Sequence, residues 1–188
     1  MTAVTKRKKF HTGEIPVPEG IEVSLEGRRL IVKGPLGKVE KDFSKIPVRF
    51  EIGEDKVNFQ IFLKGRKGLS LVNTIKRIVE NLIIGVTKGF TYKMKIYYRH
   101  FPMNVTVGKG EVLIKNFAGE RGVRRAKIVG DTEVIVKGDD VIIKGLSKED
   151  VGTTAANIHQ ACEIRAKDPR IFLDGIYLYE RKEGLEDA

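Results

Sequence analysis

The sequence predicts an α+β protein of two tandem duplicated domains, each a small antiparallel sheet of two hairpins covered by one helix. An internal repeat, period-2 alternation around turn residues, and two apolar stripes at helical spacing predict this class. The repeat aligns VSLEGRRLIVKGPLGK (23–38) with VTVGKGEVLIKNFAGE (105–120), an offset of 82 residues that places Lys33 on Lys115. Each copy predicts two short strands joined by a tight turn, a hairpin.

A second hairpin follows in each half. VRFEIGEDKVNFQIF (48–62) alternates apolar and polar residues around Gly-Glu-Asp, and VIVKGDDVIIKG (134–145) does so around Gly-Asp-Asp. Alternation places one face of each strand toward a core, and the Gly/Asp clusters supply the turns.

Each second hairpin is followed by a predicted helix. Ser147 with Asp150 resembles an N-terminal capping box, Gly85 is expected to cap the first helix, and Asp168-Pro169 is expected to stop the second. The apolar stripes consist of Leu71, Ile75, Ile78, Val79 and Leu82 in the first helix and Val151, Ala155, Ile158 and Cys162 in the second.

These elements predict four segments. Residues 1–14 are expected to form a flexible basic arm with the run Lys6–Lys9, and 15–87 the first α+β repeat. Residues 88–180 are expected to form the second repeat, and 181–188 an acidic tail. The linker is expected near 85–91, and YKMKIYY (92–98) as a strand crossing between the halves.

Composition points to a polyanionic partner. The chain has 35 Lys and Arg against 25 Asp and Glu, a formal charge of +10. Proteins this basic commonly bind nucleic acid, whereas acidic membranes and anionic ligands are weaker candidates. One cysteine excludes an internal disulfide, and we find neither a signal peptide nor a membrane span. We expect the cytosol.

The sequence does not predict an enzyme. His11, His100 and His159 lack metal-ligand spacing, and Cys162 lies in an apolar stripe, so we expect it to be a buried core residue. GPLGK (34–38) and KGRKG (64–68) match no phosphate-loop pattern. Asp174-Gly175 is expected to be a turn in which Gly175 takes a positive φ. We therefore predict no catalytic residue, metal, cofactor or small-molecule substrate.

Basic residues gather in four clusters: Lys6–Lys9, Lys64–Lys67, 121–127 and 165–170. A basic surface with interleaved rings on a β-sheet scaffold is a common way to hold RNA. KGRKG is expected just before the first helix, where free N–H groups favour phosphate. The rings that could stack on bases are Tyr97, Tyr98, Phe101, Phe172, Tyr177 and Tyr179, although core packing is the more common role of any single ring.

The C-terminal stretch carries a family resemblance. Gln160, Ile164, Lys167, Arg170, Phe172, the run Asp174–Leu178 and Arg181 resemble the C-terminal signature of the universal large-subunit ribosomal protein six family, in its archaeal and eukaryotic branch. VPEGIEVSLEG, VKGPLGKVEKDF, NLIIGVTKGFTYKM and YYRHFPMNV agree, so the resemblance runs from about Ile15 to Arg181. Pro169 departs from it, since many members have Ile after the Asp.

The resemblance implies a duplicated α+β fold and a structural role in the large ribosomal subunit, without catalysis. It further implies binding to large-subunit rRNA near the base of the lateral stalk, beside the sarcin–ricin loop and neighbouring ribosomal proteins. We expect recognition of RNA shape through charge and rings. The expected rRNA-binding residues are Lys167, Arg170, Phe172, Asp174, Gly175, Tyr177, Arg181, Arg121, Arg124, Arg125, Lys64, Arg66 and Lys67.

Two other classes remain open at this point. A free-standing RNA-binding or RNA-chaperone module acting outside the ribosome would match the family over one half, whereas here both halves match. A nucleotide-using enzyme would carry a phosphate loop or paired carboxylates, and the sequence has neither.

Overall fold

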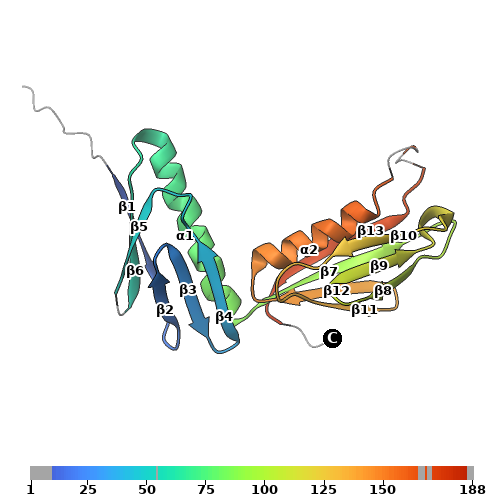
Figure 1. Ribbon diagram of the computed structural model, residues 1–188, viewed down its shortest axis with the longest axis horizontal. Coiled ribbons are helices and arrows are strands. Elements are labelled where there is room, and N and C mark those ends of the chain that lie inside the picture. The colour runs from blue at the N-terminus through green and yellow to red at the C-terminus, as the bar shows by residue number, and fades with distance from the viewer. Residues whose placement is uncertain (1–9, 54, 165–167, 169–170, 186–188) are drawn as a thin grey trace, which may run out of the picture. The chain divides into compact units, whose positions relative to one another are not determined.

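The chain forms two compact units, Met1–Thr87 and Lys88–Ala188. The structure, a computed structural model, describes residues 10–53, 55–164, 168 and 171–185 (Figure 1). Each unit holds antiparallel sheets and one long helix. The predicted class of two duplicated α+β domains is confirmed, with the difference that the hairpins of each unit belong to two separate sheets.

The first unit has two three-stranded sheets, in the orders β1-β6-β5 and β2-β3-β4. Helix α1 packs against β1, β3, β4 and β6, so it covers strands of both sheets. The elements are β1 (His11–Pro16), β2 (Glu22–Glu26), β3 (Arg29–Gly34), β4 (Gly37–Asp42), β5 (Val48–Ile52), β6 (Lys56–Ile61) and α1 (Gly65–Thr87).

The second unit repeats this plan and adds a strand. Its sheets have the orders β10-β9-β8 and β11-β12-β7-β13, and helix α2 packs against strands of both. The elements are β7 (Phe90–Tyr97), β8 (Asn104–Val107), β9 (Glu111–Lys115), the short 3-10 turn η1 (Phe117–Gly119), β10 (Val123–Lys127), β11 (Glu133–Lys137), β12 (Asp140–Gly145), α2 (Lys148–Ala161) and β13 (Gly175–Glu183).

Strand register confirms the internal repeat. Val23 pairs with Val32 in β2 and β3, and Val105 pairs with Ile114 in β8 and β9. These two pairs are related by the same offset of 82 residues that aligns the sequences. The duplication therefore extends from sequence to hydrogen-bond register.

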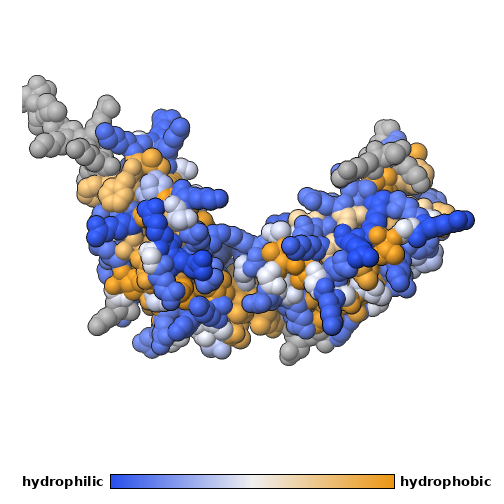
Figure 2. Space-filling view, viewed as in Figure 1, coloured by the Kyte–Doolittle hydropathy of each residue, from blue (hydrophilic) through white to orange (hydrophobic). Residues whose placement is uncertain are grey.

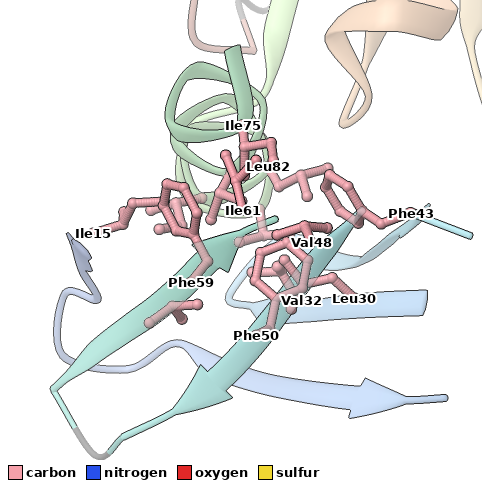
Figure 3. Packing of buried hydrophobic residues seen from close by; sticks show 14 residues of the cluster. Ile15, Leu30, Val32, Phe43, Val48, Phe50, Phe59, Ile61, Ile75 and Leu82 are labelled. Carbon is pink, nitrogen blue, oxygen red and sulfur yellow. The ribbon is translucent and has the colours of Figure 1, made fainter. Parts of the chain in front are cut away.

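The core of the first unit contains three phenylalanine rings in series. Phe43 meets Phe50 edge-on at 4.9 Å between ring centroids, and Phe50 lies 6.1 Å from Phe59. The inward residues of α1, including Ile75 and Leu82, close over them (Figure 3). Such ring pairs add to the stabilisation from buried area, by about 0.5–1.5 kcal/mol each.

The first strand differs from the expected arm. Residues 11–14, placed in a flexible segment from sequence, belong to β1, which pairs with β6 from His11–Ile61 to Pro16–Lys56. The segment lacks a run of β-branched residues, and only Ile15 is deeply buried. Its position is set by ladder hydrogen bonds rather than by local propensity.

Strand β7 also differs from its expected role. It does not cross between the halves, because it lies between β12 and β13 inside the second sheet. Its alternating burial places Tyr92, Met94 and Ile96 in the core. The sequence predicted the strand, but not the partners on either side.

Both helix ends differ from expectation. Gly85 lies buried inside α1, which continues to Thr87, and the positive φ of 76° that ends this segment is at Gly89. Helix α2 ends at Ala161 with Cys162 as its C-cap, before Asp168. At the other end the predicted cap is confirmed, since the Ser147 hydroxyl accepts a hydrogen bond from the Asp150 N–H.

The expected acidic tail begins inside a strand. Residues 181–183 belong to β13, whose far end is tied down by hydrogen bonds from the Gly184 N–H to the Gly89 carbonyl and from the Thr91 hydroxyl to the Gly184 carbonyl. Only residues 184–188 follow the strand, and the last three lie outside the described residues.

Candidate nucleic-acid interface

The predicted binding residues divide into three places in the structure. Phe172, Asp174, Gly175, Tyr177 and Arg181 lie on and just before β13. Arg121, Arg124 and Arg125 lie on and before β10, and Lys64, Arg66 and Lys67 lie at the start of α1. Lys167 and Arg170 lie outside the described residues, as does the run Lys6–Lys9.

The Asp174-Gly175 pair is not the predicted turn. Asp174 is buried, and its carboxylate accepts a hydrogen bond from the backbone N–H of Arg99. Gly175 opens β13 opposite Tyr97 and does not take a positive φ. Asp174 therefore fixes where β13 begins beside the end of β7, and its predicted contact with RNA stays a prediction.

Glycine is needed at position 175 because the Tyr177 side chain occupies the space that a Cβ would need. A Cβ there would lie 2.9 Å from both the Cζ and the hydroxyl oxygen of Tyr177. The Tyr177 ring folds back over Gly175, and its hydroxyl donates to the Leu173 carbonyl at 3.1 Å. The ring of His159 lies 5.5 Å from it, and the His159 Nδ1 meets the Ile176 carbonyl at 2.9 Å. Tyr177 is thus held in place while exposed.

These residues border an open groove of about 500 Å³ between α2 and the edge of the sheet. On the α2 side the groove is lined by glycine, alanine and His159, which recur at the spacing of one helix face. Because the glycine and alanine side chains are small, they do not fill the groove. Arg181 stands at the sheet side, 5.8 Å from the Tyr92 ring. The lining residues are Tyr92, Met94, Gly152, Ala155, Ala156, His159, Tyr177, Leu178 and Arg181.

Charge and polarity around the groove favour an anion. Glu180 is paired with Lys93 at 3.0 Å and with Lys182 at 3.3 Å, so its charge is offset within the sheet. Burial raises the pKa of Tyr177, and the Asp174 carboxylate adds to the effect, so the phenol remains a neutral donor. Arg181 is exposed and available to a phosphate.

Arg124 belongs to the fold rather than to a free surface. Its guanidinium forms two hydrogen bonds with the Glu120 carboxylate, at 2.8 and 2.6 Å, and donates to the Ala161 carbonyl at the end of α2. It also lies 4.2 Å from the Phe117 ring. The hydrogen bond to Glu120 raises the pKa of Arg124. The neighbours Arg125, exposed with one ion pair to Glu111, and Arg121, with no ion pair to a described residue, are the freer cations.

The three predicted contact cations of the first unit lie around the start of α1. The helix begins at Gly65, so Arg66 and Lys67 are in its first turn rather than ahead of it, and no acidic residue shares that turn. Lys64 precedes the helix and is exposed, like Arg66 and Lys67. The three side chains are close in sequence and face solvent at the positive end of the helix dipole.

Most of the six aromatic rings that the sequence offers for stacking are exposed, rather than packed in the core. Phe172 is half-buried, with its ring 6.0 Å from that of His100. Five of the six candidate rings are more than a third exposed: Tyr97, Tyr98, Phe101, Tyr177 and Tyr179. These five exposed side chains belong to the second unit, so that unit combines open aromatic faces with cations.

The groove itself was missed from sequence. Its signal was present as Gly152, Ala155, Ala156 and His159, which recur at i, i+3, i+4 and i+7 on α2. Small residues at that spacing occur where another element packs closely on the helix and also where a groove runs along it. The sequence does not show which case applies, because this depends on where β13 lies. Among the described residues no group of His, Cys, Asp and Glu could hold a metal, and no described helix is long and apolar enough to cross a membrane.

Comparison with known proteins gives a consistent match. A family model described as "Ribosomal protein L6" matches residues 17–89 and again 101–175, one match in each repeat. Similar proteins include the large ribosomal subunit protein uL6 of Methanobrevibacter smithii, 45% identical over 90% of this chain and 95% of that protein. The uL6 proteins of Ignicoccus hospitalis (47% identical; 89% and 93% covered) and Aeropyrum pernix (45%; 93% and 97%) are also similar.

Proposed function

Because the chain belongs to the ribosomal protein L6 family, we propose that it binds large-subunit rRNA near the base of the lateral stalk, beside the sarcin–ricin loop, and so supports translation. Membership of this family makes the protein a structural constituent of the large ribosomal subunit and not an enzyme. The observation that carries this conclusion is the family match in both repeats, since a reused single domain would match in one half.

The rRNA-binding surface that we propose is the groove between α2 and β13. The C-terminal signature residues Tyr177 and Arg181 border it, and Asp174 and Gly175 hold Tyr177 and the strand in place. Lys167 and Arg170 lie in the segment that leads from α2 to β13 in sequence and stay predicted contacts. Some signature residues would thus contact the RNA, and others would hold those contacting residues in position.

The contact would be electrostatic and shape-dependent. Arg181 would pair with a phosphate as an ionised donor, while Tyr177 would offer an exposed ring and a hydroxyl. A-form RNA hides its base edges in a deep, narrow groove, so a protein reads its backbone and 2′-hydroxyls. Small side chains along α2 allow a phosphate backbone to approach closely, which supports this assignment.

A charge reversal tests the assignment. Arg181→Glu should weaken binding to the large subunit by about tenfold and so lower the fraction of the protein that sediments with it in cells, since a lost contact and an added repulsion together cost at least about 1.4 kcal/mol. The control is Lys137→Glu, an exposed lysine at the end of β11, the edge strand on the opposite side of the same sheet from β13. Equal incorporation of both variants, with unchanged melting temperatures, would refute the groove as the rRNA site.

A further inference from the structure

We propose that the end of the first unit where α1 begins is a second RNA-binding surface, one that takes unpaired nucleotides by stacking their bases on Phe10 and Phe62. The inference rests on the proposed function, since it takes rRNA as the partner, but it names a separate surface and a different kind of RNA. The groove on the second unit suits a helical backbone, whereas this surface suits bases that are not paired.

Four large apolar side chains gather at this end of the unit. Phe10 precedes β1 and Phe62 follows β6, and the two strands pair with His11 opposite Ile61, so the rings leave the sheet at the same end. Phe10, Phe62, Leu63 and Leu69 are between 37 and 57% exposed. Figure 2 shows hydrophobic surface at the upper end of this unit, where β1 and α1 begin in Figure 1. Apolar side chains gathered at one place on a charged surface mark an interaction site.

The loop that carries two of these side chains is held firmly. The Phe62 N–H donates to the Pro47 carbonyl at 3.1 Å. A Cβ on Gly68 would lie 2.3 Å from the Leu63 carbonyl oxygen and 2.4 Å from the His11 ring, so the loop is packed onto the first helical turn. The backbone around Phe62 is thus fixed while its ring faces solvent. A ligand that binds the ring therefore loses little free energy to ordering of the loop.

Charge identifies the ligand as a polyanion. The described segments that supply the patch, residues 10–13 and 61–79, contain no Asp or Glu. Lys64, Arg66 and Lys67 are exposed and form no ion pair with a described residue. Lys6–Lys9 immediately precede Phe10 in sequence. Exposed cations on described segments that contain no acidic residue, in the half of the chain with most of the charge excess, attract a strand of phosphates.

Rings beside cations favour unpaired RNA over a duplex or a protein. Every nucleobase has a face that stacks on an aromatic ring, and cations beside the ring track the phosphates of the same strand. In an A-form duplex those faces are buried in the stack and cannot reach Phe10 or Phe62. An acidic protein segment would use the cations but would gain as much from leucine as from phenylalanine, and this difference can be measured.

A photo-crosslink in the intact large subunit tests the surface directly. Phe62→p-azidophenylalanine should crosslink to rRNA on irradiation, giving a protein–RNA adduct that ribonuclease trims. The matched control is Ile52→p-azidophenylalanine, an exposed apolar position at the other end of β5 and β6, which should not crosslink to RNA. A crosslink from position 62 to a protein, or none to RNA, overturns the proposal.

A substitution series on the full-length protein separates stacking from apolar contact. The probe is a labelled, unstructured single-stranded RNA of about 12 nucleotides, within the range that stacking surfaces bind. Phe62→Trp should bind as the unchanged protein does, and Phe62→Leu should bind at least about fivefold more weakly, since one stacked base contributes roughly 1–3 kcal/mol. Equal binding by the two variants, or no binding by the unchanged protein, overturns the proposal.

The outcomes keep the two proposals distinct. A protein that sediments with the large subunit but shows neither the crosslink nor the Trp–Leu difference retains its proposed function and lacks this surface. A protein that does not join the large subunit at all fails the proposed function first. Because Phe62 is exposed, all its variants are expected to fold, and their melting temperatures verify this.

Discussion

At the scale of single residues, three arginines close together in sequence have different roles. Arg124 joins β10 to the end of α2, because one guanidinium group meets the Glu120 carboxylate, the Ala161 carbonyl and the Phe117 ring. Arg125 forms a single exposed ion pair with Glu111, and Arg121 faces solvent. We therefore assign Arg124 to stability and keep Arg121 and Arg125 as predicted RNA contacts.

The contacts of Arg124 predict that its side chain stabilises the second unit. Arg124→Ala should lower the free energy of unfolding by about 2–3 kcal/mol, since it removes charge-assisted hydrogen bonds, a cation–π contact and a helix-end cation together. Arg125→Ala, the matched control, should cost less than about 1 kcal/mol, as an exposed ion pair does. Urea unfolding measures both, and equal costs would show that the Arg124 contacts contribute little.

The sequence could predict where these arginines lie but not what they touch. RGVRRAK is a basic run in which each arginine looks alike, and the partner that matters for Arg124 is the end of a helix 37 residues away. Asp174 is similar, since its buried carboxylate meets an N–H 75 residues away. Contacts this far apart depend on the tertiary fold, so local patterns do not contain them.

At the scale of elements, β13 distinguishes the second unit from the first. It adds a fourth strand beside β7, with a register shift between Leu178 and Glu180 that a β-bulge produces. The strand begins at Gly175 and carries Tyr177 and Arg181 to the groove. The edge strand is therefore both the last element of the fold and one wall of the proposed rRNA site.

Gly175 gives a prediction for this element. Gly175→Ala should displace the Tyr177 ring, since its Cβ would lie 2.9 Å from the ring, and should cost about 1 kcal/mol of stability while weakening incorporation into the large subunit. Gly122→Ala is the control, because nothing lies within 4 Å of a Cβ there. The Tyr177 side-chain NMR signals report the displacement, and an unmoved ring in the alanine variant would refute the positioning role.

Elements with strong local signals were predictable, and those fixed by distant partners were not. The hairpins follow from alternation and turn residues, and α2 begins at the predicted Ser147 cap. β1 was missed because HTGEIP has no run of β-formers and is completed by pairing with β6, some 45 residues on. The local pattern ends α1 too early, because Gly85 resembles a helix cap but is packed inside the helix, which continues to Thr87.

At the scale of the whole molecule, one duplicated plan has taken two forms. The register repeats at an offset of 82 residues, so both units descend from one pattern of strands and helix. The second unit has β13 and the groove beside it, while the first carries most of the charge excess and the exposed apolar end near α1. Under the two proposals above, the second unit would bind helical RNA and the first would bind unpaired nucleotides.

The central claim is that this protein is held in the large ribosomal subunit by electrostatic contacts with rRNA. The most direct measurement is sedimentation of the tagged protein from gentle lysate across a salt series, with and without ribonuclease. We predict that it co-migrates with the large subunit, is released by ribonuclease, and dissociates steeply as salt rises, since each phosphate contact adds about 0.7–0.9 to the logarithmic salt slope. Migration as a small free species at low salt would contradict the account.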